Sequence, residues 1–178
     1  GILWLGTMAG LFRFDRETGT FTHYQHDPTD PGSATGGITY SIYEDRKGRI
    51  WVSTSMGLDL FDSESESFIH YTTQDGLPGS PWGALEDDQG NLWLSTVNGL
   101  SKFNPELETF RNYDVSDGLQ SNTFSNYETF GTSPNGKMFF GGTRGVTAFF
   151  PDQIKDNPHI PPVVITDFQL ANKPVPIG

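Results

Sequence analysis

The chain has 178 residues, enough for one well-packed domain, and it contains 21 glycines and 12 prolines. Only 34% of its residues are hydrophobic while 13% are aromatic, a mixture typical of many short strands joined by tight turns. The formal net charge of −11 argues against binding to nucleic-acid phosphates or anionic membrane surfaces, and the absence of cysteine excludes disulfides, a thiolate nucleophile and cysteine-ligated zinc.

A repeat of 42 to 47 residues organises the chain. Each copy has a glycine three residues before an aromatic anchor, another glycine six residues after it, and a phenylalanine ten residues after it. A period of this length is typical of radial or solenoidal stacking, so we expect the anchors to be equivalent wedges buried at matching depths. The four anchors are Trp4, Trp51, Trp93 and Phe139.

In chain order, the repeat predicts three strands of a first sheet over residues 1–24. Four-stranded antiparallel sheets follow over residues 38–71 and 82–113, and three strands of a last sheet over 124–150. Turns such as Asp45-Arg46-Lys47-Gly48 separate the first and second strands, because aspartate bonds its own backbone there and glycine takes a positive φ. Residues 1–157 are therefore predicted to be an all-β, β-propeller fragment of about four four-stranded blades, the first and last incomplete.

The predicted arc has fewer blades than a closed propeller usually needs, and open sheet edges favour pairing with other chains. We therefore expect self-association, with a symmetric homodimer placing two arcs in one ring. No apolar run reaches the length of a membrane span, and residues 1–20 lack the layout of a signal peptide. A membrane anchor or export signal is accordingly expected outside this fragment.

Three segments carry a family resemblance. Gly1–Asp15, Phe21–Tyr24 and Ser41–Gly48 resemble the two-component regulator propeller repeat. The resemblance implies the periplasmic sensor of a hybrid two-component histidine kinase, which is the extracytoplasmic part of an inner-membrane protein. It also implies an oligosaccharide or another small molecule as the ligand, and signalling across the membrane.

The end of the chain carries a second resemblance. Asp117–Asn122, Gly141–Ile154 and Pro161–Pro174 look like the closing blade of such sensors running into their triple-tyrosine (Y_Y_Y) immunoglobulin-like domain. Residues 158–178 are accordingly expected to be a linker and the first strand of that domain. Its prolines would stiffen the junction.

No catalytic motif is evident. His23 and His70 share one repeat position, where the third copy has Asn112, which is typical of surface histidines on outer strands. The segment from His26 to Asp30 lacks the alternating ligands of a calcium loop, and glycosidase-like acid pairs do not stand out. We therefore expect no enzymatic activity, no metal and no cofactor.

Binding is the better hypothesis, since loops on a rigid scaffold often carry recognition. Trp82 is the only tryptophan outside the anchors; it either stacks on a sugar ring or fills the core beside the channel. Polar side chains on the channel-end loops would bond hydroxyls, or else only stabilise turns, and an arginine there would favour an anionic saccharide. The candidate ligand-binding residues are Trp82, Asn98, Asp117, Asn122, Asn126 and Arg144.

Two rival functions remain open. Streptogramin-lyase-type enzymes use a related propeller with a histidine and a metal at the channel mouth, and only His26 suits that role here. Alternatively, the blades are a scaffold that binds protein partners.

Overall fold

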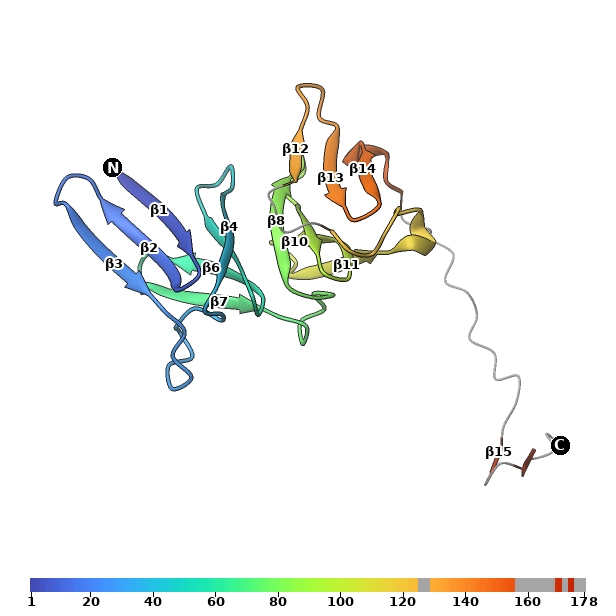
Figure 1. The fold of residues 1–178 in the computed structure, drawn as a ribbon, viewed down its shortest axis with the longest axis horizontal. Helices are drawn as coiled ribbons and strands as arrows, with labels where there is room; N and C mark the ends of the chain where they lie inside the picture. Colours follow the sequence, from blue (N-terminus) through green and yellow to red (C-terminus); the bar gives the residue numbers. More distant parts are fainter. Residues whose placement is uncertain (125–128, 156–168, 171–172, 175–178) are drawn as a thin grey trace.

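Four antiparallel sheets follow one another along the chain (Figure 1). The computed structural model describes residues 1–124, 129–155, 169–170 and 173–174. Each sheet is here called a blade, numbered in chain order. Blade 1 contains β1 (Ile2–Thr7), β2 (Gly10–Asp15) and β3 (Thr20–Tyr24). Blade 2 contains β4 (Thr39–Glu44), β5 (Ile50–Thr54), β6 (Leu58–Asp62) and β7 (Ser67–Tyr71). Blade 3 contains β8 (Pro81–Glu86), β9 (Leu92–Thr96), β10 (Gly99–Asn104) and β11 (Thr109–Tyr113). Blade 4 contains β12 (Phe130–Thr132), β13 (Met138–Gly142) and β14 (Gly145–Phe149).

The remaining described elements are short. Two 3₁₀ turns, η1 (Val115–Asp117) and η2 (Pro151–Gln153), flank blade 4 in the chain. Strands β15 (Gln169–Leu170) and β16 (Lys173–Pro174) pair with each other. The predicted linker and triple-tyrosine strand over 158–178 otherwise lie outside the described residues, and that assignment stays a prediction. No helix among the described residues is long and apolar enough to cross a bilayer.

The strand register confirms the repeat. Each anchor pairs with the residue nine positions later on the next strand, as Trp51 does with Leu60 and Trp93 with Lys102. The same offset joins Trp4 to Arg13 and Phe139 to Ala148. The four anchors are therefore equivalent in register, and the predicted all-β fold of stacked blades is confirmed.

The three tryptophan anchors pack toward the following blade. Trp51 is 1% exposed and shares a core with Leu92, Leu94 and Phe103 of blade 3. Trp93 is likewise buried, against Met138 and other residues of blade 4. Because one apolar core forms between each pair of neighbouring blades, burial of a blade depends on the blade beside it.

The expectation of equal depth is wrong for Phe139. Its side chain is 37% exposed, while Phe140 beside it is fully buried against blade 3. The outward face of blade 4, which Phe139 shares with the 52% exposed Val146, has no further blade over it in the described residues. Leu3 and Leu5 lie on the face of blade 1 that points away from blade 2. No blade covers that face in the described residues, and each of the two leucines is 37% exposed.

A buried aspartate holds the anchor in the two complete blades. The indole Nε1–H of Trp51 donates to Asp45 at 2.9 Å, and that of Trp93 donates to Asp87 at 2.9 Å. Burial alone would raise the pKa of Asp45, but hydrogen bonds from Trp51 and Arg49 outweigh it and hold the pKa below its ordinary value. Blade 4 has Ser133 and Phe139 at these two positions, so the carboxylate and its indole donor are lost together.

This pairing predicts a non-additive double mutant. Trp93→Phe leaves the buried Asp87 carboxylate without one donor and should lower the free energy of unfolding by about 1.5–3 kcal/mol. Adding Asp87→Ser, which reproduces the pair of blade 4, should cost less than the sum of the two single changes. Urea denaturation of the four proteins measures the coupling, and strictly additive losses would contradict it.

Candidate functional site

The strand order gives the blades two different ends. Because the strands are antiparallel, the β3–β4 loop (residues 25–38) and the β7–β8 loop (72–80) lie at the same end as the β5–β6 hairpin at 55–57. This is called the loop end. The turns at 45–49, 87–91 and 133–137 lie at the opposite end, the turn end.

The loop end contains a cavity of about 410 Å³, here called the loop cavity. Two histidines, two carboxylates, two prolines and several hydroxyls line it, along with Met56, which is 65% exposed. The lining comprises His26, Asp27, Pro28, Asp30, Pro31, Ser33, Ala34, Thr35, Met56, His70, Thr72, Thr73 and Gln74.

One buried carboxylate fixes the wall of the loop cavity. Asp59 on β6 is fully buried, and its Oδ2 accepts a hydrogen bond from the Thr35 amide at 2.8 Å. Its Oδ1 accepts from the Thr35 hydroxyl at 2.8 Å and lies 3.0 Å from Nδ1 of His70. The Phe68 amide also donates to the Gly32 carbonyl at 2.9 Å, so blade 2 holds the loop at a further point.

His70 lies on the outer strand β7, as the repeat predicts, but its side chain is only 26% exposed and is bonded on both sides. Besides Asp59, its Nε2 lies 2.9 Å from the carbonyl oxygen of Pro31 in the loop. The hydrogen bond with Asp59 raises the pKa of His70 above its usual 6.5, against the opposing effect of burial. His23, at the same repeat position, instead stacks on Phe12 with ring centroids 3.8 Å apart.

His26 also belongs to the cavity. Its Nδ1 lies 2.9 Å from the carbonyl oxygen of Ala34, which can only accept, so this nitrogen carries a proton. In the neutral ring, Nε2 is then an acceptor for a ligand hydroxyl. Among the described residues, no three His, Asp or Glu side chains gather closely enough to hold a metal ion.

An aromatic pair lies on the first strands of blades 2 and 3. Both ladders are irregular at the same repeat position, between Thr39 and Ser41 and between Pro81 and Gly83. Tyr40 and Trp82 occupy these irregularities, and their rings lie 4.5 Å apart at 57°. Bulges re-aim side chains and are frequent beside functional sites. The Trp82 ring is half-buried and packs on the core between blades 3 and 4, with Nε1 buried and unbonded within the described part.

The other predicted site residues do not form one cluster. Asn98 donates to the Pro78 carbonyl at 3.0 Å, and Arg144 is exposed. Asp117 and Asn122 accept hydrogen bonds from the Asp114 and Val115 amides, so both stabilise the loop after β11. Asp117 also lines a small, mainly apolar pocket between blades 3 and 4. Asn126 lies outside the described residues.

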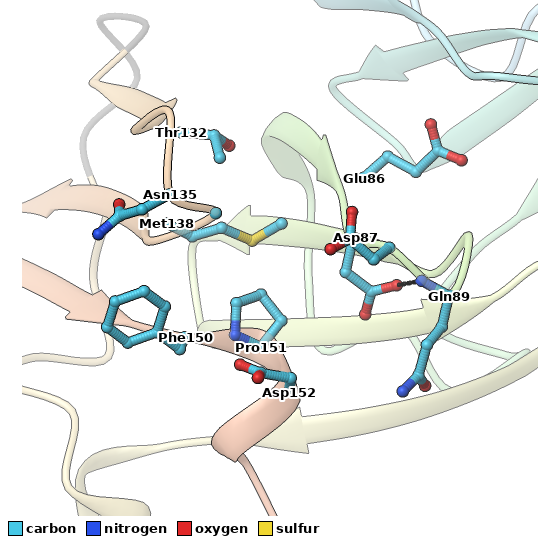
Figure 2. Close-up of a pocket in the computed structure, with 11 residues that line it drawn as sticks. Glu86, Asp87, Gln89, Thr132, Asn135, Met138, Phe150, Pro151 and Asp152 are labelled. Carbon is cyan, nitrogen blue, oxygen red and sulfur yellow. Dashed lines mark hydrogen bonds between the residues drawn. The ribbon is translucent and has the colours of Figure 1, made fainter.

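The turn end has a smaller acidic cleft of about 170 Å³ between blades 3 and 4 (Figure 2). Glu86, Asp87 and Asp152 line it, and Gln89 donates its amide hydrogen to Asp87. At the preceding junction, Lys47 and Arg49 bind Glu106 at 2.7 and 3.2 Å. Gln89, Asn91 and Asp152 occupy the equivalent positions here, so this junction lacks those ion pairs.

Sequence reasoning missed Asp59, Thr35 and Tyr40. The available signal was Asp59 itself, a carboxylate on a third strand where the other copies have Phe12, Ser101 and Thr147. A charged residue at this repeat position, where the other three copies have none, marks a local specialisation of blade 2.

Comparisons with known proteins agree with this geometry. Residues 32–56, which span the loop wall and the β4–β5 hairpin, match the family model of the two component regulator propeller. A segment of 44 residues is 50% identical to histidine kinase P4 of Formosa agariphila, covering 25% of this chain and 3% of that protein.

Two solved structures have a similar fold. The extracellular domain assigned to a hybrid two component system of B. thetaiotaomicron matches with a TM-score of 0.72 and 25% identity, covering 85% of this chain and 21% of that chain. Virginiamycin B lyase from Staphylococcus aureus matches with a TM-score of 0.58 and 15% identity, covering 86% of this chain and 53% of the lyase. This chain thus spans about a fifth of the first of these structures.

Proposed function

Because residues 32–56 match the model of the two component regulator propeller, we propose that this chain is a ligand-sensing segment of the periplasmic part of a hybrid sensor histidine kinase. The observation that carries the proposal is the loop end. There a cavity lined by His26, Asp27 and Thr72 lies on a scaffold of stacked blades, and the Tyr40–Trp82 pair lies on the first strands of blades 2 and 3. The likeness to an extracellular domain of such a system supports the location.

We propose an oligosaccharide as the ligand. Sugar rings present an apolar face that stacks on aromatic side chains and hydroxyl groups that pair with polar ones. The Tyr40–Trp82 pair supplies aromatic surface, and the loop cavity supplies His26, Asp27 and Thr72. We also propose self-association into a homodimer, through which a bound ligand would bias the receptor.

The segment itself is proposed to be non-catalytic. Its likeness to virginiamycin B lyase, at 15% identity, is a likeness of fold. His26 bonds to the backbone of its own loop, and no metal-holding group of three carboxylate or histidine side chains is found within the described ranges.

Removing the indole should weaken sugar binding. Trp82→Ala is expected to reduce the affinity for an oligosaccharide by about two- to tenfold, because one stacking contact is worth about 0.5–1.5 kcal/mol. Calorimetry with a panel of neutral and uronate-containing oligosaccharides, with and without divalent metal, measures the affinity and reveals any turnover. Leu107→Ala is the matched control, since Leu107 is 71% exposed at the turn end. Equal affinities for Trp82→Ala and the unaltered chain would contradict the placement of the sugar on Trp82. Product formation would favour the alternative that the segment is an enzyme.

A further inference from the structure

Blades 2 and 3 tie their preceding loops in the same way. In blade 3, Ser101 donates to Asn112 at 2.7 Å, and the Asn112 amide donates to the Gly76 carbonyl of the β7–β8 loop at 2.8 Å. In blade 2, the corresponding residues are Asp59 and His70, and the loop carbonyl belongs to Pro31. A third-strand residue thus holds a fourth-strand residue, which in turn holds the loop.

The two bridges differ in their chemistry. Serine and asparagine do not titrate, so the bridge of blade 3 is independent of pH in the ordinary range. In blade 2, His70 lies between a carboxylate at 3.0 Å and a carbonyl oxygen at 2.9 Å, and both can only accept. Both ring nitrogens must therefore donate for both bonds to form, and only the imidazolium can do so.

We propose that Asp59 and His70 are positioning residues of the loop cavity, which is held in its binding shape by the protonated form of His70. The part that concerns ligand affinity rests on the proposed function. Loss of the proton leaves a neutral ring that keeps one of its two hydrogen bonds. Because Thr35 still donates twice to Asp59, the segment that loosens is the cavity wall at Pro31.

The direction of the pH effect follows from the charges that face His70. Asp59 contacts the ring from β6, and the titratable groups on the loop side of the cavity are His26, Asp27 and Asp30. The pKa of His70 is raised in the folded protein. Its bridge is therefore complete below the ordinary value of 6.5 and is lost as the pH rises through the raised pKa.

Nuclear magnetic resonance tests the bridge without any ligand. The His70 ring should titrate with a midpoint above 6.5, and Asp59→Asn should lower that midpoint. Exchange of the Phe68 amide, which donates to Gly32 beside Pro31, should become up to about tenfold faster across the same midpoint after correction for intrinsic exchange. The Thr35 amide should change less.

Two variants and a control separate positioning from general pH effects. His70→Gln and His70→Asn replace the ring with amides that do not titrate. The rise in the Phe68 amide exchange rate across the His70 midpoint, here called the step, should therefore disappear. His23→Asn changes a histidine at the same repeat position that does not touch the loop cavity, and it should leave the step unchanged. A midpoint at or below 6.5, or the same step in His70→Gln, would overturn the proposal.

Measuring ligand affinity as a function of pH distinguishes this proposal from the sensing function. For any oligosaccharide that binds, affinity should fall as the pH rises through the His70 midpoint, and His70→Gln should flatten that profile. Binding with a flat profile in the unaltered chain would overturn the positioning role and leave the sensing function standing. If no oligosaccharide binds but Phe68 exchange still accelerates across the His70 midpoint, the sensing function is contradicted and the His70 bridge stands.

Discussion

Truncation of Trp51 to alanine is expected to lower the free energy of unfolding by about 3–5 kcal/mol. Trp51 is 1% exposed and packs on Tyr71 and Phe103 at the junction of blades 2 and 3. The variant opens a cavity between two blades and removes the indole donor from buried Asp45. Chemical denaturation monitored by circular dichroism measures the loss.

Phe139→Ala is the matched comparison for this prediction. Phe139 has the same register but is 37% exposed, so its removal should cost about 1–2 kcal/mol. Equal losses for the two variants would mean that stacking between neighbouring blades does not determine anchor burial.

Gly99→Ala should be destabilising by at least about 2 kcal/mol, because its cost combines backbone strain with a collision. Gly99 has φ of +106°, and a Cβ there would lie 2.3 Å from the carbonyl oxygen of Tyr113. Gly10 and Gly57 occupy the same repeat position and would meet Tyr24 and Tyr71 in the same way. The repeat glycine is thus required by the outer strand that passes over it.

Two other glycines separate these causes. Gly136 has φ of +82° but open space around it, so Gly136→Ala should cost about 1–2 kcal/mol from strain alone. Gly131 has neither feature, and Gly131→Ala should be nearly neutral or slightly stabilising. Thermal melting of the three variants measures the order, and a Gly99→Ala protein as stable as Gly131→Ala would contradict the assigned clash.

The blades could be predicted because each copy repeats the same local chemistry. The turn at Asp45 to Gly48, the glycine at position 57 and the anchor at Trp51 each indicate a strand end or a buried strand on their own. Agreement of several copies then fixes the register. The depth of Phe139 could not be read this way, since burial depends on a neighbouring blade and not on the anchor itself.

The site was harder to predict because its groups depart from the repeat. Asp59 replaces the residue that the other copies have, and its partners Thr35 and His70 are 24 and 11 residues away. Tyr40 became relevant only when the register irregularity brought it to Trp82. Asn98, Asp117 and Asn122 were chosen as polar loop residues. Asn98 bonds to the backbone of the β7–β8 loop, while Asp117 and Asn122 bond to backbone amides of the loop after β11.

Together these features give blade 2 a special role. Its buried carboxylate and histidine hold the loop that lines the cavity, while blade 3 performs the same task with neutral groups. A sensor needs an element whose shape differs between two states. The loop wall at Pro31 is held by the Asp59–His70 bridge, which titrates, whereas the Ser101–Asn112 bridge does not.

Mapping of the ligand by backbone and indole N–H chemical shifts tests the central claim most directly. With a binding oligosaccharide, the largest saturable changes are predicted at residues 26–35, at 72–74 and at the Trp82 indole. Changes confined to the turn end around Glu86 and Asp152, or to the exposed faces of blades 1 and 4, would contradict a sensing site at the loop end.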